Sequence, residues 1–189
     1  MYRLLLIFLL LRFETWCSMC KSNEPEDFGF IITKPITLFL VRNIHINDLL
    51  ALSNTLIHVT LQVYLLGRHY YGNNTLINKA LFLLTYRQIC GFLTKLPIHK
   101  QFKKLESEHD IPPKHYNFFF HFSAHTFLLV IIGLDINKQY QSYGNILTPL
   151  FLTLYIFQSL RLLATRGHYS IDIANGTMFG YLIHHSKLF

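Results

Sequence analysis

The chain has 189 residues, of which 51% are hydrophobic and 14% are charged, and its formal net charge is +7. Soluble domains carry about 25% charged residues, so the composition argues against a soluble domain and indicates a membrane protein. The basic residues lie between long apolar runs and no nucleic-acid recognition module is present, so the charge fits anionic lipid headgroups better than RNA or DNA.

The N-terminal segment begins with a basic residue and continues as a strongly apolar run. We expect a hydrophobic helix over residues 2–19, retained as a transmembrane helix or signal anchor, because no small-x-small cleavage site follows it. Cys17 and Cys20 have a C-x-x-C spacing without a second group of ligands, so we interpret them as incidental cysteines. The chain is thus predicted to consist of this N-terminal helix in residues 1–20 and a transmembrane domain in residues 21–189.

The apolar segment 28–41 is too short to span a bilayer, and we expect Pro35 to interrupt it. We interpret this segment as an interfacial or re-entrant piece. Five further spans are predicted at residues 48–67, 75–95, 116–134, 145–165 and 170–186. Asn47 or Asp48 is expected to cap the first of these five. Because no alternating strand pattern is present, the predicted fold class is all-α, an integral membrane bundle of about six helices.

Ionisable side chains within predicted membrane helices are costly and are therefore candidate functional residues. Arg87 lies in the third span, His125 lies in the fourth, and a polar group surrounds the junction of the last two spans. The members of this last group are Arg161, Arg166, His168 and Asp172. With six spans, the connections 21–47, 96–115 and 166–170 lie on the same side of the membrane. Arg87 lies in the later half of its span and His125 in the first half of its span. The sequence therefore predicts that both approach His168 on that side.

The spacing of His168 and Asp172 indicates a chemically useful pair, because side chains four residues apart face each other on a helix. A carboxylate beside an imidazole fixes its tautomer and stabilises its protonated form. His168 is then a candidate nucleophile toward phosphorus, and His125 a candidate proton donor to the leaving group. The candidate phosphate-binding residues are Arg87, Arg161 and Arg166, since arginine binds phosphate oxygens in pairs. This scheme requires no metal ion or other cofactor.

Structural interpretations of the same residues stay open at this point. His125 taken alone is compatible with a helix-packing hydrogen bond, and Arg161 and Arg166 are compatible with positions at the end of a membrane helix. Eight further histidines fall mainly at predicted helix ends or in loops, and we interpret them as solvent or headgroup contacts. They are His58, His69, His99, His109, His115, His121, His184 and His185.

Two short motifs carry a resemblance to a known family. SAHT (123–126) and HYSID (168–172), with His168 43 positions after His125, resemble the paired motifs of the sphingomyelin synthase-like branch of the lipid phosphate phosphatase (PAP2) superfamily. Four longer segments resemble, in order, the plant phosphatidylcholine:diacylglycerol cholinephosphotransferase family. They are SNEPEDFGFIIT, YRQICGFLTKLP, FFFHFSAH and QSLRLLATRGHYSIDIANG.

The resemblance implies a six-span transferase that moves a phosphocholine headgroup between phosphatidylcholine and diacylglycerol without a nucleotide or metal. It implies that His125, His168 and Asp172 are the catalytic triad. Transfer to ceramide, as in sphingomyelin synthases, and hydrolysis, as in lipid phosphate phosphatases, are the alternatives. Ala124 stands where the motif usually has glycine, so we expect the headgroup fit or the rate to differ.

The resemblance also implies an integral membrane protein of the endoplasmic reticulum, with the Golgi or the plasma membrane as alternatives. The predicted connections 21–47 and 96–115 are the richer in Lys and Arg, and the positive-inside rule assigns them to the cytosol. Analogy with sphingomyelin synthases instead implies an active site that faces the lumen. The sequence indicates no oligomeric state.

Overall fold

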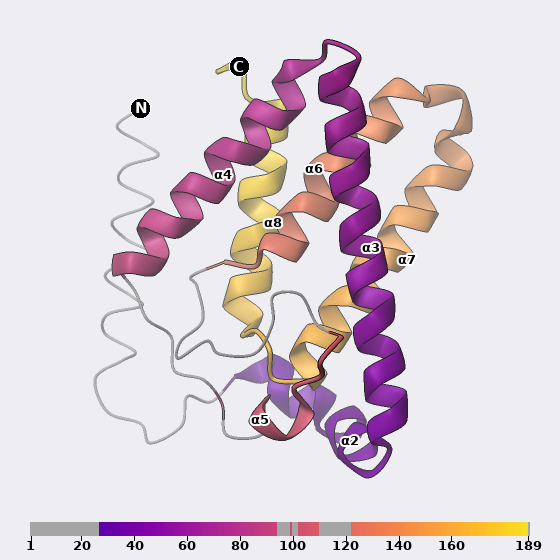
Figure 1. Ribbon diagram of the computed structural model, residues 1–189, viewed down its shortest axis with the longest axis vertical. Helices are drawn as coiled ribbons and strands as arrows, with labels where there is room; N and C mark the ends of the chain where they lie inside the picture. Colours follow the sequence, from indigo (N-terminus) through magenta and orange to yellow (C-terminus); the bar gives the residue numbers. More distant parts are fainter. Residues whose placement is uncertain (1–26, 94–98, 100–101, 110–121, 189) are drawn as a thin grey trace.

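The computed structural model describes residues 27–93, 99, 102–109 and 122–188, and every regular element in these ranges is a helix (Figure 1). The predicted all-α class is therefore confirmed for the described part of the chain. The predicted N-terminal helix over 2–19, with Cys17 and Cys20, lies outside it. The helices are α2 (Phe28–Arg42), α3 (Ile44–Tyr70), α4 (Asn74–Leu93), α5 (Phe102–Leu105), α6 (Ala124–Gln139), α7 (Gly144–Ala164) and α8 (Ser170–His185), with a 3₁₀ turn η1 (Gln141–Tyr143) before α7.

Two stretches in the described ranges are long and apolar enough to cross a membrane, Ile44–Tyr70 and Gln141–Ala164. Most of their residues are not buried within the protein. Leu56 and Val63 on α3 and Ile146 on α7 are among the large apolar side chains that are exposed. Contiguous apolar surface of this extent marks a region that contacts lipid or another protein. The helical fold and these two helices are those of an all-α membrane protein.

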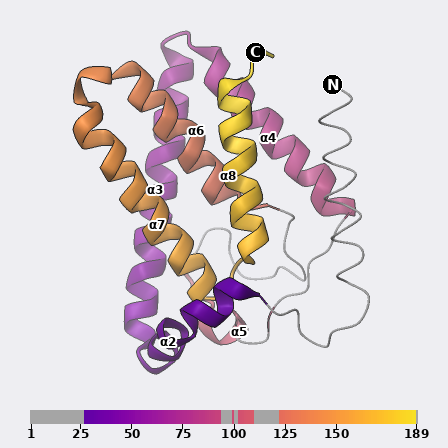
Figure 2. The ribbon, with the colours of Figure 1, turned by 180° about the vertical axis from the view of Figure 1, so that it is seen from behind.

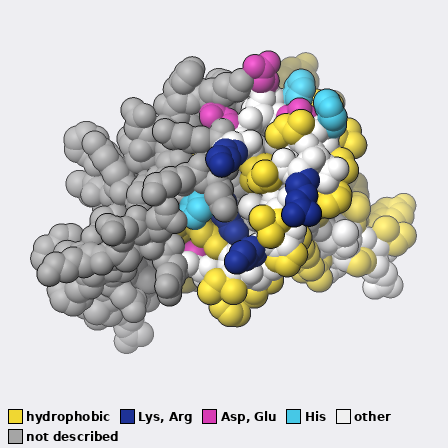
Figure 3. Space-filling model, turned by 90° about the horizontal axis from the view of Figure 1, so that it is seen from below, with side chains coloured by type: hydrophobic (Ala, Val, Ile, Leu, Met, Phe, Trp, Pro, Cys, Tyr) yellow, Lys and Arg dark blue, Asp and Glu magenta, His cyan; other side chains and the backbone are white. Residues whose placement is uncertain are grey.

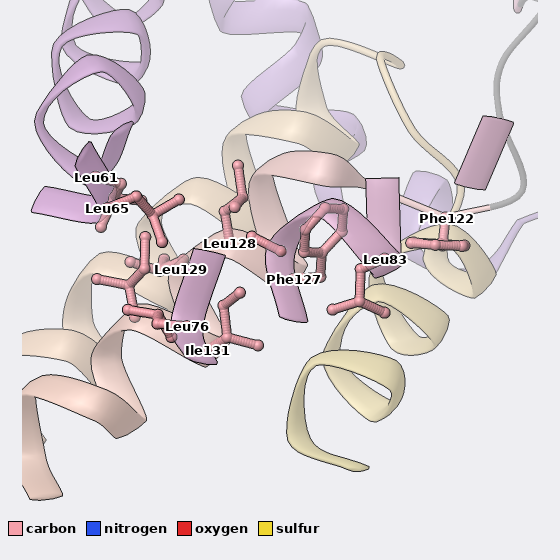
Figure 4. Close-up of a cluster of buried hydrophobic side chains, with 11 residues drawn as sticks. Leu61, Leu65, Leu76, Leu83, Phe122, Phe127, Leu128, Leu129 and Ile131 are labelled. Carbon is pink, nitrogen blue, oxygen red and sulfur yellow. The ribbon is translucent and has the colours of Figure 1, made fainter. Parts of the chain in front are cut away.

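The core lies around the first two thirds of α6, in which nearly every residue from His125 to Gly133 is buried, and Figure 4 shows part of it. Phe127, Leu128 and Ile131 of this helix belong to one cluster of buried side chains with Leu61 and Leu65 of α3. α4, α7 and α8 complete the surroundings of α6 (Figure 2). A helix that is apolar nearly all round belongs in the centre of a bundle, and this is where α6 lies.

α3 begins at Ile44, so the predicted cap at Asn47 or Asp48 is wrong. Asn43 has the non-helical backbone at the N-cap position, although its side chain makes no capping bond. Asn47 is buried inside the helix and donates to the carbonyl oxygen of Leu105 at 2.8 Å. A tertiary hydrogen bond, and not helix capping, therefore explains the asparagine at position 47.

The predicted interruption at Pro35 is also wrong, because α2 continues through it to Arg42. Proline removes one backbone donor from the helix, but packing can maintain the helical path. The hydroxyl of Thr33 donates to Gly29 O at 2.6 Å, and the hydroxyl of Thr37 donates to Ala164 O at 2.7 Å. The first of these buried bonds lies within α2, and the second holds α2 against the end of α7 at one end of the bundle, where α5 also lies (Figures 1 and 2).

The surface at this end of the bundle combines basic and apolar side chains (Figure 3). Phe28, Ile31 and Ile32 of α2 are strongly exposed. A helix that exposes apolar residues across the end of a bundle is suited to the membrane interface, and the interfacial or re-entrant placement of this segment stays a prediction.

Candidate functional site

The structure brings His125, His168 and Asp172 together in the interior of the bundle. The centroids of the His125 and His168 rings are 6.5 Å apart, and Nδ1 of His168 lies 3.4 Å from Oδ2 of Asp172. All three side chains are buried, and Asp172 is fully so. The predicted meeting of these residues is therefore observed, and it takes place where the N-terminal ends of α6 and α8 lie together.

His125 lies in the first turn of α6 because this helix begins later than predicted. Ser123 has an extended backbone and its hydroxyl accepts a hydrogen bond from Thr126 N at 3.4 Å, which makes it the N-cap. The helix therefore begins at Ala124, and the prediction of a helix that runs continuously from residue 116 through His125 is wrong at this point. At 16 residues, α6 has a length of about 24 Å, which is shorter than a bilayer core of ~30 Å.

His168 and Asp172 meet for a reason other than helical spacing. α8 begins at Ser170, so His168 precedes the helix and Tyr169 is the N-cap. Oδ2 of Asp172 accepts a hydrogen bond from Tyr169 N at 3.0 Å and also faces the ring of His168. One carboxylate oxygen thus both stabilises the N-terminus of α8 and orients the imidazole of His168. The start of this helix and the geometry of the site therefore depend on the same side chain.

A second link fixes α6 to α8 at the site. The backbone N–H of Ser123 donates to Asp172 O at 3.1 Å, so the residue that caps α6 bonds to the first turn of α8. Gly176 allows this approach: a Cβ there would lie 2.9 Å from Ser123 O and 3.2 Å from Thr126 Cβ. Small residues permit such close packing of membrane helices, and here that packing sets the separation of the two histidines.

Gly176→Val is expected to force α6 and α8 apart, because its side chain would meet the backbone oxygen of Ser123. Overpacking of this kind costs about 1–3 kcal/mol, which corresponds to a fall in melting temperature of roughly 3–10 °C for a chain of this size. Thermal unfolding in detergent measures the change. Gly67→Val in α3 is the matched control, since a Cβ at Gly67 has nothing within 4 Å. Equal melting temperatures for the two variants would contradict the proposed close contact.

Arg87 and Arg161 both lie close enough to His125 to act on it electrostatically. The Nε of Arg87 donates to Phe122 O at 2.8 Å, next to the cap of α6. Arg161 lies in the last turn of α7 and is 5% exposed. Two predicted arginines thus accompany the histidines, and their positive charge suits an anionic group placed between the rings.

The contacts of Arg166 differ from those expected of a phosphate-binding residue. Its guanidinium donates to Phe30 O at 2.9 Å and to Thr33 Oγ1 at 3.2 Å, and it lies over the Phe30 ring at 4.4 Å. Arg166 also has a φ of 60°, at the position after the α7 C-cap that glycine usually occupies. This costs roughly 1–2 kcal/mol, and the contacts with α2 maintain the conformation. These contacts hold the loop that carries His168.

Asp27 provides the corresponding attachment from the side of α2. Its carboxylate accepts bonds from the N–H of Ser170 at 2.8 Å and from the Ser170 hydroxyl at 2.7 Å, and it caps α2 through Phe30 N at 3.2 Å. One side chain therefore caps the first turns of both α2 and α8. Together with Arg166, it fixes the loop before α8 to α2.

Asp27→Ala is expected to lower the free energy of unfolding by about 2 kcal/mol, because two helix N-termini lose their cap at once. Chemical unfolding in detergent provides the measurement. Asp48→Ala is the control, since Asp48 also lies in the first turns of a helix, α3, but caps nothing. A loss no greater than that of the control would show that Asp27 does not connect α2 to α8.

His58 is a site residue that sequence reasoning missed. We expected a solvent or headgroup contact, but His58 is 6% exposed and its ring centroid lies 4.6 Å from that of His125. The signal was present in the spacing of the buried residues of α3, which alternates between three and four. These residues are Asn47, Ala51, Asn54, His58, Leu61 and Leu65. That spacing places His58 on the inward face of the helix.

Within the described ranges, no three His, Cys, Asp or Glu side chains form a group that could hold a metal ion. Fold and site together define an all-α membrane protein with a buried His–His–Asp cluster accompanied by two arginines. The model of the AtPDCT1/2 family matches residues 26–187, and the chain belongs to this family.

Two relatives from Arabidopsis thaliana agree with this assignment. The chain is 35% identical over 161 residues to phosphatidylcholine:diacylglycerol cholinephosphotransferase 1 and 37% identical over 163 residues to phosphatidylcholine:diacylglycerol cholinephosphotransferase 2. Each alignment covers 85% of this chain but 52% and 53% of the respective relative, so the chain spans about half the length of these proteins. No solved structure matches the chain.

Proposed function

We propose that the protein is a membrane phosphotransferase that moves a phosphocholine headgroup between phosphatidylcholine and diacylglycerol. The two relatives are named for this reaction. The observation that carries the proposal is the arrangement of two buried histidines, 6.5 Å apart between ring centroids, with a buried carboxylate on one of them. The transmembrane domain, residues 21–189, is on this view the catalytic domain.

In the first half-reaction His168 attacks the phosphorus of phosphatidylcholine. The nucleophilic atom is Nε2, because Nδ1 faces Asp172. The new N–P bond forms as the bond from phosphorus to the glycerol oxygen breaks, and that oxygen takes a proton from His125. Diacylglycerol leaves, phosphocholine remains on His168, and Asp172 balances the charge of the ring.

The second half-reaction reverses these steps with a new acceptor. The hydroxyl of a second diacylglycerol gives its proton to His125 and its oxygen attacks phosphorus, while the N–P bond breaks. The ring centroids lie 6.5 Å apart, so the two rings are close enough for His168 and His125 to act on opposite sides of one phosphorus atom once the substrate is bound.

Positive charge at the site supports an anionic transition state. Arg87 and Arg161 act on His125 electrostatically and are proposed to bind the phosphate oxygens. Arg166, which was predicted to share this role, is proposed to act mainly on the structure, because its guanidinium contacts α2.

The test is a headgroup-exchange assay in microsomes that contain the expressed chain. Labelled diacylglycerol and unlabelled phosphatidylcholine are supplied, and labelled phosphatidylcholine is expected without added nucleotide or metal. Parallel reactions with ceramide, and the release of free phosphocholine or phosphate, measure the alternative acceptors. Absence of labelled phosphatidylcholine with inserted, folded protein would refute the proposal. Sphingomyelin as the main product would show that ceramide, and not diacylglycerol, is the acceptor. Fractionation of the same cells tests the proposed location in the endoplasmic reticulum.

A further inference from the structure

His58 occupies an unusual position for a polar side chain. It lies near the middle of α3, a helix long and apolar enough to cross a membrane, and its ring contacts that of His125 at 4.6 Å between centroids with a 44° tilt. An ionisable residue at such a depth is expensive and usually functional. The contact with His125 joins a residue outside the triad to the proposed proton donor.

Packing alone does not explain an imidazole at this position. Asn47 and Asn54, the other polar residues of the inward face of α3, have buried partners in Leu105 O and Gln158 Nε2 at 2.8 and 3.0 Å. Oδ1 of Asn47 has no hydrogen-bond partner among the described residues, but the side chain is held through its amide nitrogen. Nδ1 of His58 is also buried, and none of the residues that the structure describes gives it a hydrogen bond. A buried polar atom without a partner destabilises a fold, and leucine fills the next inward positions at Leu61 and Leu65 without that cost.

We propose that His58 is a positioning residue that holds the ring of His125 in place and controls its protonation, and this inference rests on the proposed function. His125 lies between two imidazoles, His58 on α3 and His168 before α8. The other charged groups that act on it are Arg87 of α4 and Arg161 of α7. His58 exchanges no proton with the substrate: the proton passes from His125 to the glycerol oxygen and returns from the acceptor hydroxyl.

The physical basis is that two imidazoles in contact titrate as a pair. Each proton on one ring disfavours a proton on the other, so the pair resists the doubly protonated state. His125 must both give and accept one proton in each cycle, and a neighbour that limits the pair to one proton suits both steps. A phenylalanine or leucine at position 58 would fill the space but would remove this coupling.

The test compares His58→Phe, His58→Leu and His58→Gln in the exchange assay, with His184→Phe as a matched control at the far end of α8. The two apolar variants are expected to lower kcat by about tenfold or more with little change in KM, because proton transfer and not lipid binding is affected. His58→Gln keeps a polar side chain against the His125 ring but lacks a titratable proton, so it is expected to restore only the part of kcat that depends on the position of that ring. His184→Phe is expected to match the wild type. An inserted apolar variant with the kcat of the wild type would overturn the proposal.

A second measurement does not depend on lipid transfer. Diethyl pyrocarbonate modifies imidazole nitrogens, and its rate at His125 can be followed by mass spectrometry in the intact membrane protein. We expect this rate to change several-fold in His58→Gln and to stay constant in His184→Phe. An unchanged rate at His125 would refute the role of His58 even if every variant transferred lipid poorly. Failure of the wild type to transfer phosphocholine would instead refute the proposed function.

Discussion

His168→Ala is expected to abolish headgroup exchange, with a fall in kcat of at least ~10⁴-fold, because no other group replaces the nucleophile. The substitution leaves the capping bond from Tyr169 N to Asp172 intact, so the start of α8 is retained. Exchange in microsomes measures the rate, and alkaline-stable label on the protein after incubation with phosphatidylcholine labelled in its phosphate measures the covalent intermediate. Both signals are expected to disappear together.

His185→Ala is the control for this result. His185 is exposed at the other end of α8, where its ring contacts His184 and Tyr181. We expect this variant to insert normally and to keep its exchange activity. If His168→Ala retained biological activity while inserted, a lipid-binding or scaffold role on an enzyme-like fold would be favoured over transfer.

Asp172→Asn is expected to cause the second-largest loss, a fall in kcat of ~10²–10⁴-fold. The amide has the size of the carboxylate and keeps an oxygen that can accept from Tyr169 N, so the helix cap survives. The amide oxygen that accepts from Tyr169 N also faces Nδ1 of His168, but the negative charge that stabilises the protonated His168 ring is lost. The full dependence of the exchange rate on lipid concentration is expected to show a lower kcat with little change in KM.

Asp48→Asn removes the same charge from the start of α3 and provides the comparison. Its exchange rate is expected to equal that of the wild type, and its melting temperature should match that of Asp172→Asn within a few degrees, since Asp172→Asn keeps the cap. A large loss of stability in Asp172→Asn without a specific loss of kcat would mean that Asp172 serves the fold of the loop alone.

Local sequence determined the helical class and the positions of several helices. The helices predicted at 75–95, 145–165 and 170–186 agree within two residues at each end with α4, α7 and α8. Long apolar runs bounded by polar residues and turns suffice for this, because a backbone in lipid must satisfy its own hydrogen bonds. The candidate cluster of His125, His168 and Asp172 also followed from the order of the helices and the spacing of polar residues along them.

Tertiary structure alone decided how the site is assembled. The capping residue of α6, Ser123, bonds to Asp172 of α8, and Arg166 contacts α2, more than 130 residues earlier in the chain. His58 joins His125 only because α3 packs against α6. In each case the partner is distant in sequence, so the local conformational preference of one segment does not predict the contact. The three to four residue spacing on α3 indicated which face of the helix turns inward, but only the packed bundle shows what that face meets.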